Sequence, residues 1–122
     1  MYSHAVWEIE YTDEWDAWWQ QLSEGDQERV RAAVEILEEV GPALGRPLVD
    51  TLQGSRLANL KELRPRGGYL RVLFAFDLRR VAILLLGGDK TGRWAAWYAE
   101  AIPAAERLYE EHLAQLRVEG EL

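Results

Sequence analysis

The sequence contains no cysteine among its 122 residues. This absence excludes disulfides, thiolate metal sites and a cysteine nucleophile, and it is compatible with a reducing compartment. Long apolar runs are also missing, because the longest, Val81–Leu86, is too short to span a membrane. The N-terminal residues lack the basic and apolar regions of a signal peptide. We therefore expect a cytoplasmic protein in which residues 1–122 form a single domain with its own hydrophobic core.

The charge of the chain is unevenly distributed. Its net charge of −7 argues against a nucleic-acid-binding protein, since such domains are usually basic. However, residues 56–93 hold nine basic and three acidic side chains, whereas the rest of the chain holds five basic and 18 acidic ones. A local positive field can capture a polyanion in spite of the net charge. This segment therefore predicts a phosphate-binding site, unless its charges are ordinary solvated charges around a sheet.

The first third of the sequence predicts a strand followed by two helices. Residues 7–11 alternate apolar and acidic side chains, a period typical of a half-buried strand. Thr12 and Ser23 can each cap a helix, because a hydroxyl oxygen accepts a hydrogen bond from the first turn. Apolar residues recur at helical spacing after both caps, and Gly41–Pro42 ends the second helix. Residues 42–55 indicate a connector.

The rest of the sequence predicts three strands and a C-terminal helix. The strands cover residues 59–64, 70–77 and 81–86, and Gly87-Gly88-Asp89 ends the last one. Residues 94–101 favour a short helix, and Pro103 suits the first position of a final helix. The expected fold is α+β, with an N-terminal strand and two helices packed on a mainly antiparallel sheet.

Several side chains of the basic segment are expected to converge. Glu62 and Arg64 leave the same face of their strand, and Arg71 lies on the next strand. Lys90 follows the third strand, and Tyr98 lies eight residues beyond it. Guanidinium groups bind phosphate oxygens in pairs, and a carboxylate or lysine among cations acquires a pKa suited to proton transfer. A structural ion-pair cluster is the alternative interpretation.

Other chemical interpretations are weaker. A phosphate-binding loop with the G-x-x-x-x-G-K-[ST] spacing is absent, and neither His4 nor His112 has a second histidine at ligand spacing, so we expect no metal site. A slip of one residue would exchange the inward and outward positions of Lys61 and Glu62, so the sequence leaves their orientation open. We expect Trp15, Trp18 and Trp19 to lie in the core. We expect Arg79 and Arg80 to lie in a solvated turn.

The segment LANLKELRPRGGYLRVLFAFDLRRVAILLLGGDK resembles the RelE/HigB superfamily of toxins from bacterial toxin–antitoxin pairs, in its phage-derived HigB-like branch. Its most specific parts are residues 61–64, 71–74 and 88–90, and the likeness extends over nearly the whole chain. The resemblance implies a RelE-like microbial ribonuclease fold. It also implies a ribosome-dependent mRNA endoribonuclease that cuts the codon in the ribosomal A site without metal or cofactor, by attack of a ribose 2′-hydroxyl on the adjacent phosphate.

The resemblance assigns roles to the converging residues. Arg71 matches the arginine that grips phosphate, Lys90 the basic residue after the last strand, and Tyr98 the C-terminal aromatic residue. Glu62 stands where better-known RelE members have a lysine. Our hypothesis is that Glu62 accepts the 2′-hydroxyl proton, Arg64 and Arg71 stabilise the phosphoryl oxygens, and Lys90 or Tyr98 serves the leaving oxygen. Further RNA contacts are expected from Lys61, Arg56, Arg66, Arg93 and Trp97.

The expected partners are mRNA on the ribosome, with its rRNA, and a cognate antitoxin with a DNA-binding helix-turn-helix. The acidic remainder of the chain would suit such a basic antitoxin. It also motivates a different hypothesis, because a strongly acidic body is repelled by rRNA. In that case the chain is a catalytically inactive RelE-fold module that acts by binding a partner protein.

Overall fold

The computed structural model describes residues 6–92 and 94–122. A strand and two helices come first, a group of strands follows, and a long helix closes the chain. The elements are β1 (Ile9–Tyr11), α1 (Asp13–Gln20), α2 (Glu24–Val40), the 3₁₀ turn η1 (Gly41–Ala43), β2 (Val49–Thr51), β3 (Lys61–Leu63), β4 (Leu70–Phe76), β5 (Ala82–Asp89) and α3 (Trp94–Val118).

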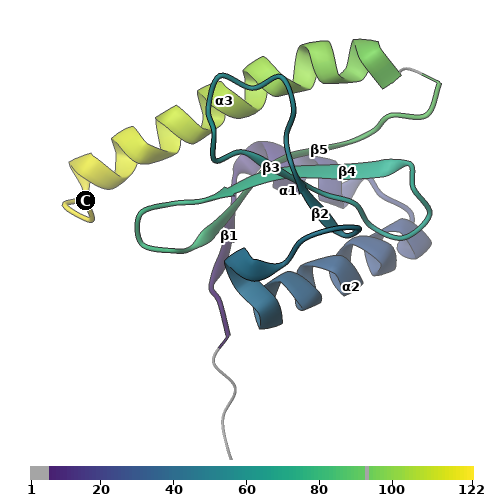
Figure 1. Ribbon diagram of the computed structural model, residues 1–122, viewed down its shortest axis with the longest axis horizontal. Coiled ribbons are helices and arrows are strands. Elements are labelled where there is room, and N and C mark those ends of the chain that lie inside the picture. The colour runs from purple at the N-terminus through teal and green to yellow at the C-terminus, as the bar shows by residue number, and fades with distance from the viewer. Residues whose placement is uncertain (1–5, 93) are drawn as a thin grey trace, which may run out of the picture.

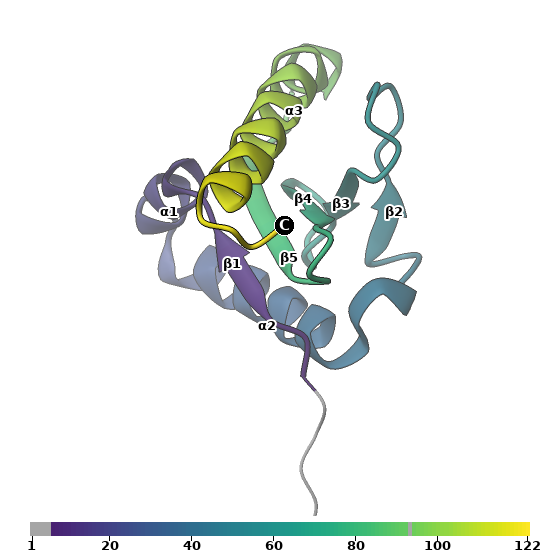
Figure 2. The same ribbon diagram turned by 90° about the vertical axis from the view of Figure 1, so that its left-hand side faces the viewer.

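The five strands form one sheet in the order β1-β5-β4-β3-β2. β1 runs parallel to β5, and every other pair is antiparallel. Figure 1 shows α3 across one face of this sheet and α1 and α2 against the other, and Figure 2 shows the same layers from the side. The expected α+β architecture is therefore confirmed, including the N-terminal strand, the mainly antiparallel sheet and the C-terminal helix. Among the described residues, no helix is long and apolar enough to cross a bilayer.

Both predicted helix caps are present. The Thr12 hydroxyl oxygen accepts a hydrogen bond from the Trp15 N–H at 3.0 Å and donates one to the Leu85 carbonyl at 2.6 Å. The Ser23 hydroxyl oxygen accepts from the Asp26 N–H at 3.2 Å. Each cap satisfies an N–H group that the first helical turn leaves without a partner. The Thr12 cap also ties the start of α1 to β5.

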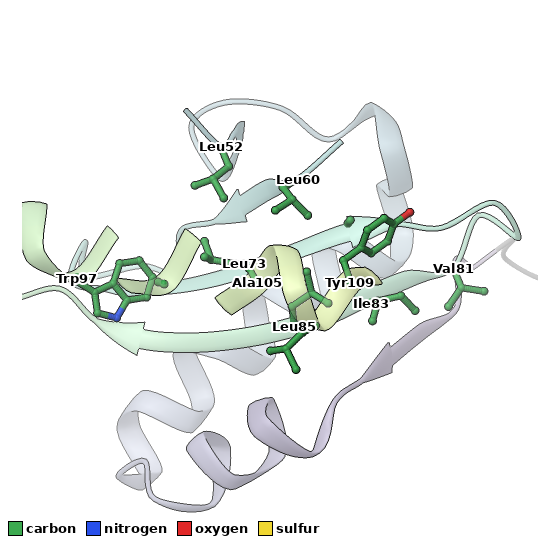
Figure 3. Close-up of a cluster of buried hydrophobic side chains, with 12 residues drawn as sticks. Leu52, Leu60, Leu73, Val81, Ile83, Leu85, Trp97, Ala105 and Tyr109 are labelled. Atoms are coloured by element: carbon green, nitrogen blue, oxygen red, sulfur yellow. The ribbon is translucent and has the colours of Figure 1, made fainter. Parts of the chain in front are cut away.

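The sheet separates two hydrophobic cores. Side chains of β4 alternate between them, with Val72 and Phe74 facing α1 and α2, and Leu73 and Ala75 facing α3. Figure 3 shows the core under α3, where Leu52 and Leu60 from the β2–β3 loop join residues of β4, β5 and α3. The second core contains Trp15, which confirms that this tryptophan packs inside the protein.

Two predicted boundaries are wrong. Residues 42–55 are not only a connector, because β2 pairs there with β3 from Val49 to Thr51. The predicted short helix and the helix starting at Pro103 are a single helix, α3, with Pro103 inside it. Proline removes one helical N–H group, but the buried stripe from Trp97 through Ala105 continues past it and packs on the sheet. Tertiary packing therefore outweighs the local break.

The prediction that Gly87-Gly88-Asp89 ends the third strand is also wrong, because β5 continues to Asp89. A Cβ atom on Gly87 would lie 2.3 Å from the Trp18 ring, and one on Gly88 would lie 2.2 Å from the Trp97 ring. The two glycines thus let indole rings close on the strand from opposite sides of the sheet. Close approach of a ring, rather than a turn, requires glycine here.

The turn between β4 and β5 is held by ion pairs and is not merely solvated. The Asp77 carboxylate accepts hydrogen bonds from the Arg79 guanidinium at 2.8 Å and the Val81 N–H at 3.2 Å, and it lies 3.0 Å from His112 Nε2. Burial raises the pKa of Asp77, but the bonds from His112 and Arg79 outweigh it and hold the pKa below its usual value. Arg80 lies over the Trp7 ring at 5.1 Å.

Replacing Gly87 with alanine would place a methyl group against the Trp18 ring. Overpacking a filled core costs about 1–3 kcal/mol, so we expect Gly87→Ala to lower the free energy of unfolding in urea by that amount. Gly45→Ala is the matched control, because nothing lies within 4 Å of its methyl position. That control should change the free energy by no more than about 0.5 kcal/mol. Equal unfolding free energies for the two variants would contradict this role of Gly87.

Candidate active site

Glu62 lies at the centre of the predicted cluster. In the sheet it stands opposite Asp50 on β2 and Leu73 on β4, so its side chain leaves the face covered by α3. Lys61 stands opposite Phe74 and leaves the face covered by α2. This register answers the question that the sequence left open. The Glu62 carboxylate is directed toward α3, and the residue is only 5% exposed.

Three predicted residues bind this carboxylate. The Tyr98 hydroxyl donates to Glu62 Oε1 at 2.6 Å, and Arg71 Nε lies 3.4 Å from the same oxygen. Arg64 Nη2 donates to Oε2 at 3.0 Å. Burial, together with the hydrogen bond to Glu62, raises the pKa of Tyr98, so its hydroxyl keeps its proton. β3, β4 and α3 therefore meet at one carboxylate.

Arg71 is fixed in place by the backbone around it. Its Nη1 donates to the Gly68 carbonyl at 3.0 Å and to the Leu70 carbonyl at 2.9 Å, and its Nε donates to the Tyr98 hydroxyl at 3.3 Å. It stands opposite Gly88 in the β4–β5 ladder, so no side chain crowds it from that strand. The guanidinium is thus oriented before any ligand arrives.

Arg64 bridges two acidic residues. Besides Glu62 it contacts Asp50 Oδ2 at 3.4 Å, and Asp50 in turn accepts a hydrogen bond from Arg46 at 3.1 Å. Its Nε is buried without a hydrogen-bond partner in the described part of the chain. Asp50 was not predicted as a site residue, because β2 was interpreted as a connector. Its pairing with Glu62 across the β2–β3 ladder is what brings it to the cluster.

Lys90 belongs to the same electrostatic cluster. Its backbone N–H donates to the Tyr69 carbonyl at 3.0 Å, directly after β5, and the residue is 7% exposed. Burial, and then the positive charge of Arg71, lower the pKa of Lys90, while Glu62 acts in the opposite direction. An amine with a lowered pKa exchanges its proton closer to neutral pH than an ordinary lysine.

A pocket of about 460 Å³ opens over this cluster. Its walls come from the β2–β3 loop, β3 and the first turns of α3, and it is lined by Leu52, Gln53, Glu62, Arg64, Ala95 and Tyr98. A larger hollow of about 540 Å³ lies beside α2 and includes Arg29 and Ile36, but no converging hydrogen-bonded cluster lines it. No group of three or more histidine, aspartate or glutamate residues able to hold a metal ion occurs among the described residues.

Of the residues predicted to make further RNA contacts, those that the structure describes do not line this pocket. Lys61 lies on the opposite face of the sheet, and Arg66 lines the hollow beside α2. Arg56 is paired with Glu110 of α3 at 2.8 Å. Direct RNA stacking on Trp97 is contradicted by its burial, because its ring packs in the core against Gly88. Arg93 lies outside the described residues.

Solved structures with a similar backbone include RelE toxins. The isolated E. coli RelE toxin has a TM-score of 0.59 at 13% identity, covering 76% of this chain and 94% of RelE. The RelE–RelB complex from Pyrococcus horikoshii OT3 contains a chain with a TM-score of 0.53 at 22% identity, covering 71% of this chain and 97% of that one. These similarities define the fold as that of the RelE toxins.

Sequence relatives define the family. The family model described as phage derived protein Gp49-like matches residues 17–110. The candidate toxin HigB2 of Mycobacterium tuberculosis (strain ATCC 25618 / H37Rv) is 55% identical over 102 residues, which cover 81% of this chain and 51% of HigB2. HigB3 of the same strain, also a candidate toxin, is 48% identical over 99 residues, which cover 81% of this chain and 87% of HigB3. The chain spans about half the length of HigB2. It belongs to the Gp49-like family, in the RelE/HigB toxin superfamily.

The environment of Lys90 predicts an observable titration. Its ammonium should titrate below the ordinary lysine pKa of 10.5, because it is buried beside Arg71. Lys61 is the only other lysine in the sequence, so side-chain NMR of labelled lysine gives two signals, which a Lys61→Arg variant assigns. Arg71→Ala removes a neighbouring positive charge and should raise the pKa of Lys90. A midpoint for Lys90 at or above 10.5 in the unaltered protein contradicts this description.

Proposed function

We propose that this protein is the toxin of a toxin–antitoxin pair and that it cleaves mRNA on the ribosome as a metal-independent endoribonuclease, in the cytoplasm. The observation that carries the proposal is that Arg64, Arg71 and Tyr98 meet at the Glu62 carboxylate, beside a lysine with a lowered pKa, and that Glu62, Arg64 and Tyr98 line a pocket. Cleavage of a phosphodiester by general acid–base catalysis requires a proton acceptor, a proton donor and positive charge beside the phosphoryl oxygens, and these residues provide all three. The candidate toxins HigB2 and HigB3 support the part of the proposal that makes this protein a toxin.

The reaction begins with binding of the phosphate. The arginines that now hold Glu62 are planar donors suited to two phosphoryl oxygens, so an incoming phosphate can take over some of these hydrogen bonds. This exchange frees a carboxylate oxygen of Glu62. The same arginines then stabilise the negative charge that builds on the phosphoryl oxygens.

Bond breaking follows within the same site. The 2′-hydroxyl oxygen forms a bond to phosphorus, its proton passes to Glu62, and the bond between phosphorus and the 5′-oxygen breaks. The leaving oxygen takes a proton from Lys90 or Tyr98. Tyr98 stays protonated because its pKa is raised, and Lys90 releases a proton more readily because its pKa is lowered.

An antitoxin is the proposed protein partner. RelE occurs in complex with RelB in the solved P. horikoshii and E. coli structures. In this chain, α1 and α2 both carry acidic side chains in their first turns, namely Asp13, Glu14, Asp16, Glu24 and Asp26. These carboxylates complement the basic surface expected of a DNA-binding antitoxin with a helix-turn-helix.

A second candidate function is an inactive RelE-fold module that acts by binding a partner. The observation in its favour is that Glu62 already neutralises Arg64 and Arg71 in the free protein. A site satisfied in this way could serve structure alone. Substitutions at Arg71 and Glu62 separate the two functions. An enzyme loses mRNA cleavage when these residues change, whereas an inactive module has no cleavage to lose.

Arg71→Ala should slow mRNA cleavage on purified translating ribosomes by about 10²–10³-fold, since it removes one preorganised charge stabiliser. Arg107→Ala is the matched control, because Arg107 is exposed on α3 and pairs only weakly with Glu111 at 3.7 Å. Urea denaturation of both variants checks that they remain folded. Unchanged cleavage by folded Arg71→Ala would rule out the proposed role of Arg71.

Glu62→Gln tests the proton acceptor. The amide keeps the size of the side chain but cannot take up the 2′-hydroxyl proton. We expect the single-turnover cleavage rate to fall by about 10²–10⁴-fold, the usual contribution of general acid–base catalysis. An unchanged rate would instead assign Glu62 to charge balance between the arginines.

A further inference from the structure

The loop between β2 and β3, residues 52–60, forms one wall of the pocket. It rises beside α3 in Figure 1, and its two ends enter the core through Leu52 and Leu60, which are labelled in Figure 3. The Leu52 N–H donates to the Leu60 carbonyl at 3.0 Å, which closes the base of the loop. Both ends of the loop are therefore fixed.

The tip of the loop is fixed by a buried carboxylate that the proposed reaction does not use. Glu106 on α3 is 7% exposed, and its Oε2 accepts hydrogen bonds from the Ser55 hydroxyl and the Arg56 N–H, both at 2.8 Å. Asn59 Nδ2 also donates to the Tyr109 hydroxyl at 2.9 Å. A loop held at this many points presents its outward side chains in a fixed position.

Gln53 is the polar side chain that this loop presents to the pocket. It lies between buried Leu52 and Gly54, whose φ of +87° suits glycine and turns the chain at this point. Gln53 is exposed, and its carboxamide has no hydrogen-bond partner within residues 6–92 and 94–122. A carboxamide offers both a donor and an acceptor, the combination that pairs with the edge of a nucleobase.

We propose that the pocket contains a nucleobase subsite, in which Gln53 hydrogen-bonds the edge of the base next to the bound phosphate. Leu52 and Ala95 supply apolar contacts for the base, while Arg64 and Tyr98 lie on the phosphate side. The volume of about 460 Å³ is within the range of small-ligand pockets. Unpaired RNA bases are recognised in this way, by contacts to the base plane and hydrogen bonds to its edge. This subsite rests on the proposed function, because it names the ligand of the same site.

The test compares binding of nucleoside 3′-monophosphates with binding of inorganic phosphate, by NMR titration of the whole protein. A base subsite makes at least one nucleotide bind more tightly than phosphate. Loss of one base-reading contact reduces discrimination by roughly 5–100-fold, so Gln53→Leu should reduce that advantage by a comparable factor. Gln21→Leu, at an exposed glutamine outside the pocket, should keep the advantage. Equal binding of nucleotides and phosphate, or an advantage that survives Gln53→Leu, overturns the subsite.

Mapping of mRNA cleavage sites separates this inference from the proposed function. If the protein cleaves with a base preference at the cut, Gln53→Leu should flatten that preference, whereas Gln21→Leu should not. If cleavage occurs with the same preference in Gln53→Leu, the subsite is wrong and the nuclease stands. If nucleotides bind through Gln53 but no mRNA is cut on ribosomes, the proposed function fails and the base subsite remains.

Discussion

The carboxylate of Glu62 is the group on which the candidate site depends. It binds a tyrosine hydroxyl from α3, a guanidinium from β4 and the guanidinium of Arg64, the residue directly after its own strand, and it is 5% exposed. A buried charge is tolerated only when it is paired, and removing one partner of such a pair typically costs about 3–5 kcal/mol. A buried carboxylate needs such partners, and this requirement holds the three donor groups together around Glu62. A phosphate can replace that carboxylate as the acceptor, because it offers oxygens to the same donors.

The fold provides this arrangement through close backbone packing. β4 is the middle strand, and its ladder with β5 places Arg71 opposite Gly88, so β5 presents no side chain to the guanidinium. The Trp97 ring packs on the same glycine. This contact fixes the start of α3 and therefore the position of the neighbouring Tyr98. Because α3 continues past Pro103, this start is anchored by the whole length of the helix on the sheet. A residue far from the pocket can thus influence the position of the Tyr98 hydroxyl.

Much of this site could be predicted from the sequence, because it depends on local periodicity. The period of two placed Glu62 and Arg64 on one face, and short turns made Arg71 a neighbour. What could not be predicted depends on tertiary contacts. Three residues of β2 have no signal apart from their pairing with β3. The burial of Trp97, which was predicted as an RNA contact, depends on the close approach of its ring to Gly88. The anchoring role of Glu106 depends on residues about 50 positions away in the chain.

Our proposed mechanism is that this carboxylate–guanidinium cluster promotes attack of a ribose 2′-hydroxyl on the adjacent phosphate. Its most direct test is the chemistry of the RNA ends produced when the chain acts on translating ribosomes. This mechanism predicts a 5′-hydroxyl on the downstream fragment and a 2′,3′-cyclic phosphate, or its opened form, on the upstream fragment, because the 2′-oxygen becomes bonded to phosphorus. A 5′-phosphate on the downstream fragment would contradict it, since such an end requires attack by water in place of the 2′-hydroxyl.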